Sequence, residues 1–176
     1  MWLSIIIIVV QSVSEWVKVS RFEMSLDQAK GVVGVFCSQF DHALDDKNRF
    51  KIPAALRDEL GLKTYLIKSP DSETKCIFLY SEAGWNELYK EFNQSGEHNQ
   101  AMRRMARKIL SGVVSGEVDK GGRLTLNAAL KEYAGITDEV HIVGNNNHIE
   151  IWSPEEWAKE LALLDEQSTD ELNINF

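Results

Sequence analysis

The sequence predicts an α+β fold made of two copies of one unit, related by an approximate twofold axis. The chain has 176 residues, of which 44% are hydrophobic and 26% charged, so it can bury the core of one ordinary domain or of two small ones. Segment 44–62 aligns without gaps on segment 118–136, and six of the 19 positions are identical. Within each copy, short strand patterns alternate with short helix signals. A single copy has too small a core to be stable alone, so the two copies should pack on each other.

A second block of similarity extends the repeat. Segment 77–81 with Trp85 matches segment 149–153 with Trp157, at a shift of 72 residues instead of 74. The tryptophans therefore fall at corresponding positions on apolar faces, which indicates packing in the core rather than a platform for stacking bases.

Each copy begins with an alternating strand that leads into an Asp-x-x-x-Arg turn, from Asp45 to Arg49 and from Asp119 to Arg123. Asn48 in the first turn, and the glycines Gly121 and Gly122 in the second, tolerate the positive φ that such turns require. We therefore expect a hairpin at each turn, with the next short strand at 50–52 or 124–126.

The rest of each copy contains a short helix, a second hairpin and a closing helix. Pro53 or Asn127 starts the short helix, and Gly61 or Gly135 ends it. The second hairpin joins 65–68 to 77–80 in the first copy and 140–143 to 149–152 in the second, and the closing helix is capped by Ser81 or Ser153.

An amphipathic helix is expected between the copies. Its apolar positions recur with helical spacing at Met102, Met105, Ala106, Ile109 and Leu110, and its other face carries Arg103, Arg104, Arg107 and Lys108. Such a charged face is typical of the solvated side of a connecting helix.

These signals divide the chain into five parts. The N-terminal extension has an apolar run at 5–10, which is too short to span a bilayer, and no basic residue precedes it as a secretory signal requires. We expect the functional chain to begin near Val35, with the extension arising from a misplaced start. The parts are the extension 1–34, the first repeat with its closing helix 35–98, the connecting helix 99–110, the second repeat 111–164 and an acidic tail 165–176.

Charge and motifs limit the function. The net charge of −8 argues at first against a nucleic-acid partner, yet 153–176 alone carries seven acidic residues and one basic residue. Cys37 and Cys76 give no disulfide framework and read as small buried residues of a protein in a reducing cytoplasm. The four histidines lie at no metal-ligand interval, and no phosphate-binding or catalytic motif is present, so we expect no metal, no cofactor and no enzyme activity.

The tandem Asp-x-x-x-Arg turns, each followed by a strand and a helix start, resemble the MraZ family over about residues 35–160. The match includes Glu150-Ile-Trp-Ser and both tryptophan helices. It departs from the family pattern at Asn127, where a proline is usual, and asparagine caps a helix well. The resemblance implies two AbrB-like, swapped-hairpin β-barrel repeats.

The resemblance also implies a function. MraZ proteins are cytoplasmic, nucleoid-associated regulators that bind short direct repeats in their own promoter, upstream of the cell-division and cell-wall gene cluster. They assemble into rings, so the expected partners are double-stranded promoter DNA and further copies of the chain, with no membrane and no small-molecule substrate.

The turns supply the candidate DNA-binding residues. Arg49 and Arg123 end tight turns on a two-stranded ribbon, an element that fits the major groove, where arginine can bind guanine O6 and N7. Asp45 and Asp119 are expected to orient them, and an ion pair to each aspartate is the purely structural alternative. The other candidates are Lys47, Lys51 and Lys120 for phosphates and Asn48 for a base edge or for the turn conformation.

A different class of function is also compatible with the sequence. An AbrB-like antitoxin, or an oligomeric interaction scaffold, would bind a protein partner, and the acidic segment 165–176 could serve as the arm that wraps it. Two barrel copies in one chain argue against this alternative, because antitoxins of this kind usually carry one.

Overall fold

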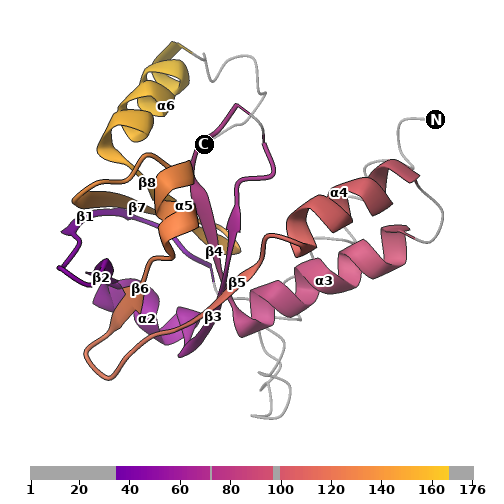
Figure 1. The fold of residues 1–176 in the computed structure, drawn as a ribbon, viewed down its shortest axis with the longest axis horizontal. Coiled ribbons are helices and arrows are strands. Elements are labelled where there is room, and N and C mark those ends of the chain that lie inside the picture. Colours follow the sequence, from indigo (N-terminus) through magenta and orange to yellow (C-terminus); the bar gives the residue numbers. More distant parts are fainter. Residues whose placement is uncertain (1–34, 72, 97–99, 167–176) are drawn as a thin grey trace, which may run out of the picture. The chain divides into compact units, whose positions relative to one another are not determined.

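The computed structural model describes residues 35–71, 73–96 and 100–166. The expectations for the extension 1–34 and for residues 167–176 of the tail lie outside these residues. Figure 1 shows the arrangement of the helices and strands.

The described chain has the α+β architecture that the sequence predicts, with two antiparallel sheets. One sheet has six strands in the order β1-β7-β8-β4-β3-β5, and the other is a two-stranded ribbon of β2 and β6. The strands are β1 (Gln39–Ala43), β2 (Arg49–Lys51), β3 (Lys63–Lys68), β4 (Ile77–Ser81), β5 (Val114–Glu117), β6 (Arg123–Thr125), β7 (Glu139–Asn145) and β8 (His148–Trp152).

The second hairpin of each repeat is confirmed, whereas the first is wrong. β3 pairs with β4, and β7 with β8, as predicted. The strands on either side of each Asp-x-x-x-Arg turn do not pair with each other. Instead β1 pairs with β7, β5 with β3, and β2 with β6, so every one of these pairings joins the two repeats. Strand exchange lets two small units share one core, which neither could build alone.

The register of the pairing reveals the expected twofold relation. In the β4–β8 pair, Phe78 lies opposite Glu150, its counterpart at a shift of 72. In the β2–β6 pair, Phe50 lies opposite Leu124, its counterpart at a shift of 74. Each pair of equivalent residues meets at the local axis, so the ribbon and the sheet are both symmetric about it.

The helices begin and end as their sequences require. α2 (Ala54–Leu60) follows Pro53, and Gly61 ends it with a φ of 71°. α5 (Ala128–Tyr133) is capped by Asn127, whose side chain accepts a 2.8 Å hydrogen bond from the backbone N–H of Ala129. Asparagine therefore replaces proline without loss of the helix start.

The closing helices are α3 (Glu82–Gly96) and α6 (Pro154–Glu166). Ser81 Oγ accepts a hydrogen bond from the N–H of Gly84 at 3.1 Å, and Ser153 Oγ from that of Glu156 at 3.2 Å. Both predicted caps are confirmed, and each satisfies one of the free N–H groups at a helix start.

The main core is shared by the two repeats. Phe50 and Leu124 on the inner face of the ribbon are almost fully buried, as are Leu79, Ile142 and Ile151 of the sheet. Cys76 is buried, but Cys37 is exposed and the prediction for it is wrong. The side chain of the neighbouring Phe36 is buried. Because successive side chains of an extended segment point to opposite sides, that of Cys37 points to solvent.

A second cluster joins α3 to α4 (Gln100–Leu110), the helix between the repeats. Trp85 stacks on Tyr65 with ring centroids 5.2 Å apart, and Ile109 of α4 is buried beside them. In the second repeat Trp157 stacks in the same way on His141, at 4.8 Å. None of the helices that the structure describes is long and apolar enough to cross a membrane.

Candidate nucleic-acid interface

Both Asp-x-x-x-Arg turns are built by their aspartates. Oδ1 of Asp45 accepts hydrogen bonds from the N–H groups of Lys47 at 2.9 Å and Arg49 at 3.0 Å. Oδ1 of Asp119 accepts from Gly121 at 2.8 Å and Arg123 at 2.9 Å. A carboxylate that binds the backbone ahead of it fixes a tight turn, so each arginine is held at the first position of its strand.

Each turn has one left-handed residue, Asn48 in the first, as predicted, and the second of the two glycines in the other. Asn48 has a φ of 54° and Gly122 a φ of 73°. Asparagine and glycine adopt this conformation at little cost, whereas a branched side chain would strain the turn.

The β2–β6 ribbon gathers three cations on one face. Lys51 lies opposite Arg123 in the register, and Arg49 lies opposite Thr125. Phe50 and Leu124, the pair between these two pairs, point into the core. Since residues alternate between the two faces of a strand, Arg49, Lys51 and Arg123 project together from the outer face of the ribbon.

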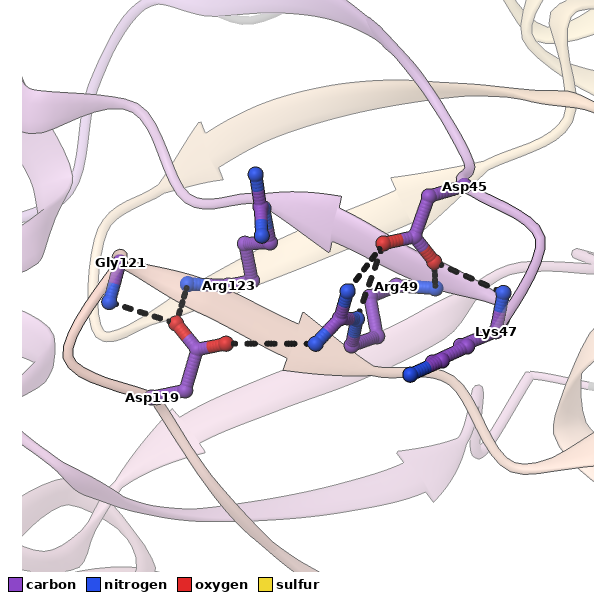
Figure 2. A network of polar contacts seen from close by, with 6 residues as sticks. All are labelled: Asp45, Lys47, Arg49, Asp119, Gly121 and Arg123. Carbon is purple, nitrogen blue, oxygen red and sulfur yellow. Dashed lines mark hydrogen bonds and ion pairs between the residues drawn. The ribbon is translucent and has the colours of Figure 1, made fainter.

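Arg49 is held by both aspartates. Its Nε and Nη2 atoms contact Oδ2 of Asp45 at 2.9 and 2.8 Å, and its Nη1 lies 3.7 Å from Oδ2 of Asp119 (Figure 2). The hydrogen bond from Arg49 lowers the pKa of Asp45 to about 2, and the same contact raises the pKa of Arg49. The Arg49 side chain is 28% exposed, so its guanidinium is oriented by protein and still reaches solvent.

Arg123 has a different environment, and the structure does not form the ion pair with Asp119 that was the purely structural alternative. Figure 2 shows the Arg123 side chain leaving the strand away from the Asp119 carboxylate, which faces Arg49. The backbone N–H of Arg123, not its side chain, is the main cause that lowers the pKa of Asp119. Within the described residues the exposed Arg123 guanidinium makes no hydrogen bond or ion pair, so all its donors face solvent.

The two arginines differ because both aspartates contact Arg49. The Asp119 carboxylate contacts Arg49 of the other repeat, and the Asp45 carboxylate contacts Arg49 of its own repeat.

Lys47 and Lys120 are both exposed at the tips of their turns, beside the ribbon face. We find the six predicted basic and amide residues on these two turns and on the ribbon, but Asn48 has its side chain engaged elsewhere.

Two basic residues that the sequence analysis missed hold the turns in place. Lys131 of α5 donates from Nζ to Oδ1 of Asn48 at 2.7 Å. Arg57 of α2 donates from Nη2 to the carbonyl of Ile52 at 2.8 Å and packs against Gly122, where an added Cβ would lie 2.6 Å from its Cζ. Arg57 and Lys131 match at a shift of 74, as do Asn48 and Gly122, so the repeat alignment contained the signal.

Backbone hydrogen bonds between the two repeats also hold the turns. The N–H of Leu126 donates to the carbonyl of Asn48 at 2.8 Å, and the N–H of Ile52 donates to that of Gly122 at 2.8 Å. Each turn is thus fixed by the strand end and the helix of the other repeat, which makes the ribbon one rigid platform.

The described residues offer no evident site for a metal. No group of three or more His, Cys, Asp or Glu side chains in 35–71, 73–96 and 100–166 could hold an ion. Burial raises the pKa of the Cys76 thiol, which keeps it protonated and a poor ligand.

Comparison with known families gives two matches along the chain. The sequence model of the family described as "MraZ protein, putative antitoxin-like" matches residues 35–108 and again residues 109–173. The two matches correspond to the two repeats and together cover most of the chain.

Curated relatives match the same region. A protein of Dehalococcoides mccartyi named "Transcriptional regulator MraZ" is 37% identical over 134 residues, which is 76% of this chain and 93% of the relative. Proteins with the same name from Moorella thermoacetica and a Roseiflexus species are 36% identical over 125 residues and 30% identical over 131. These two alignments cover 71% and 74% of this chain, and 85% and 90% of the respective relatives.

Proposed function

The chain belongs to the MraZ family, and from this premise we propose that it is a DNA-binding transcriptional regulator that reads double-stranded DNA with the outer face of the β2–β6 ribbon. The observation that carries the proposal is the placement of Arg49, Lys51 and Arg123 side by side on that face. A two-stranded ribbon is narrow enough to enter the major groove, so these side chains can meet base edges there.

The two arginines have different parts in this proposal. Arg123 has free donors for a bidentate contact with guanine O6 and N7. Arg49 is oriented by Asp45 and Asp119, a pre-organised arrangement that reduces the entropy lost on binding. Its uncommitted donors contact a base or the adjacent phosphate.

The lysines supply affinity rather than sequence preference. Lys47 and Lys120 at the turn tips, and Lys51 on the ribbon, are exposed and reach the phosphates on either side of the groove. Phosphate contacts fix the position of the protein on the duplex and make binding depend on salt. Asn48, by contrast, serves the turn, because its amide oxygen already accepts from Lys131.

Further parts of the proposal extend the family resemblance to this chain. The repeats form the swapped-hairpin, AbrB-like barrel, which the exchange of β1 and β5 between repeats supports. The protein acts in the cytoplasm at the nucleoid, on direct repeats in the promoter of its own gene, upstream of the cell-division and cell-wall cluster. Copies assemble into a ring, so that several ribbons engage successive repeats and gain avidity from high effective concentration.

A footprint on the DNA upstream of the gene tests this proposal. We expect protection of short, evenly spaced direct repeats, with loss of protection as salt rises. Uniform or absent protection over that region would contradict it.

An antitoxin-like role is the second candidate, favoured by the description of the matching family model. In that case a protein partner would bind with fixed stoichiometry and would be recovered with the chain from its own cells. Recovery of promoter DNA without such a partner supports the regulator.

A further inference from the structure

Helix α6 presents leucines to solvent. Leu161, Leu163 and Leu164 are 46, 55 and 47% exposed, and Leu161 and Leu164, three residues apart, share one face of the helix. Exposed apolar patches of this kind mark surfaces that bind another molecule.

One position of this face is covered in the first repeat. At the shift of 72, Tyr89 corresponds to Leu161 and is 45% exposed, much as Leu161 is, whereas Phe92 corresponds to Leu164. Phe92 is half-buried and packs in the cluster that includes Ile109 of α4. The comparison of the repeats therefore indicates that, among the described residues, Leu164 lacks the helical neighbour that its counterpart has.

A groove elsewhere on the described chain has matching chemistry. It lies between α3 and α4, with a volume of about 850 Å³. Phe92, Ala106 and Leu110 give it apolar walls, and Arg103 and Arg107 stand along it. An amphipathic helix with an acidic flank suits such a groove.

The charges of the two elements are complementary. α4 carries four basic residues, namely Arg103, Arg104, Arg107 and Lys108, and no acidic residue. Segment 154–166, which forms α6, carries five acidic residues and one basic residue. Opposite charges around apolar centres favour association and fix its orientation.

We propose that α6 of one copy docks into the α3–α4 groove of a second copy, head to tail. This inference deepens the assembly part of the proposed function and rests on it. α6 packs on β7, whereas α3 packs on β3 and β4, and β8 lies between β7 and β4 in the sheet (Figure 1). The two surfaces therefore belong to different parts of the fold. When α6 of one copy occupies the groove of a second copy, the second copy still has its own α6 available for a third. Repetition of such a contact produces a closed ring or an open filament.

Two variants with complementary defects test the contact. Arg103→Glu with Arg107→Glu reverses the charge of the groove and leaves α6 intact, and Leu161→Asp with Leu164→Asp spoils α6 and leaves the groove intact. In sedimentation velocity each variant alone is expected to show the 20.0 kDa mass of a single chain. An equimolar mixture should form a 1:1 heterodimer and nothing larger, because one intact groove meets one intact α6.

Controls separate this result from misfolding. Leu62→Asp changes a leucine that is 71% exposed outside both surfaces, and it should keep the wild-type mass. Circular dichroism checks the fold of each variant. Milder pairs, Arg103→Ala with Arg107→Ala and Leu161→Ala with Leu164→Ala, should raise the dissociation constant at least about tenfold without charge reversal.

Three outcomes would overturn the contact: a wild-type chain that stays single at all concentrations, charge-reversed variants that keep the wild-type mass, or a mixture that forms no heterodimer. The DNA-binding proposal is tested separately by Arg123→Ala, which changes neither the groove nor α6. Unchanged DNA binding in Arg123→Ala with normal assembly would contradict the DNA-binding proposal alone, whereas groove or α6 variants that keep the wild-type mass would contradict the contact alone.

Discussion

Lys131 and Asn48 lie 83 residues apart in the chain, yet Nζ of Lys131 donates a 2.7 Å hydrogen bond to Oδ1 of Asn48. The helix of the second repeat thereby holds the turn of the first. Arg57 and Gly122 form the corresponding contact across the local axis. Here the Arg57 side chain packs against the backbone of Gly122, which has no side chain of its own. Both turns of the ribbon face thus depend on both repeats.

The hydrogen bond between Lys131 and Asn48 is expected to stabilise the fold by about 1 kcal/mol. A double-mutant cycle with Lys131→Met and Asn48→Gly measures it, because glycine keeps the positive φ while removing the acceptor. Chemical denaturation of the four proteins should give that coupling energy. Additive effects of the two substitutions would show that the contact is not formed.

Gly122→Ala should destabilise the protein by more than about 1–2 kcal/mol, the cost of a left-handed alanine alone. The added Cβ would also meet Cζ of Arg57 at 2.6 Å. Gly135→Ala is the matched control, since Gly135 has a φ of 64° and the nearest atom to the new Cβ is Oγ of Ser153, at 3.9 Å. A denaturant midpoint for Gly122→Ala equal to that of Gly135→Ala would contradict the packing of Arg57.

Asp45 should contribute to stability at neutral pH and lose that contribution in acid. Its pKa is about 2 in the fold and 3.8 ordinarily, so the unfolded chain takes up the proton first as the pH falls. The difference in Tm between the wild type and Asp45→Asn should be constant from about pH 5 to pH 8 and shrink between about pH 4 and pH 2. A difference that instead changes around pH 6 to 7 would assign the effect to another group.

Lys120→Ala should weaken binding to all DNA sequences about equally and reduce the slope of log K against log salt by about 1. The reason is the loss of one phosphate contact, with no base contact removed. Lys75→Ala, another exposed lysine, is the control and should leave the slope unchanged. A change in sequence preference in Lys120→Ala would mean that this lysine reads a base.

The elements of the fold were predictable because their signals are local. Asn127 indicates the start of α5, and Gly61 indicates the end of α2. The alternation of apolar and polar residues in 65–68 and 77–80 predicts the β3–β4 hairpin. The partners of β1 and β2 were not predictable, because a tight turn between two strands reads as a hairpin whether the strands pair with each other or with a second repeat. Which pairing wins depends on the core that the repeats share, a property of the whole chain.

The candidate site shows the same division. The positions of Asp45, Arg49, Asp119 and Arg123 followed from the repeated motif, and the positive φ of Asn48 from its residue type. The choice of Asp119 between Arg123 and Arg49 depends on the distance across the β2–β6 ribbon. Contacts across the axis, such as that of Lys131 with Asn48, need the three-dimensional arrangement of both repeats.

The most direct test of the account is the affinity of Arg123→Ala for the promoter repeats, measured by fluorescence anisotropy at fixed salt, with sedimentation velocity to check assembly. Loss of a bidentate contact with guanine should cost about 1–3 kcal/mol, or roughly 5- to 150-fold in affinity, while binding to unrelated DNA changes less. Lys75→Ala should bind as the wild type does. An unchanged affinity of Arg123→Ala for the promoter repeats, with assembly intact, would contradict the reading of DNA by the ribbon face.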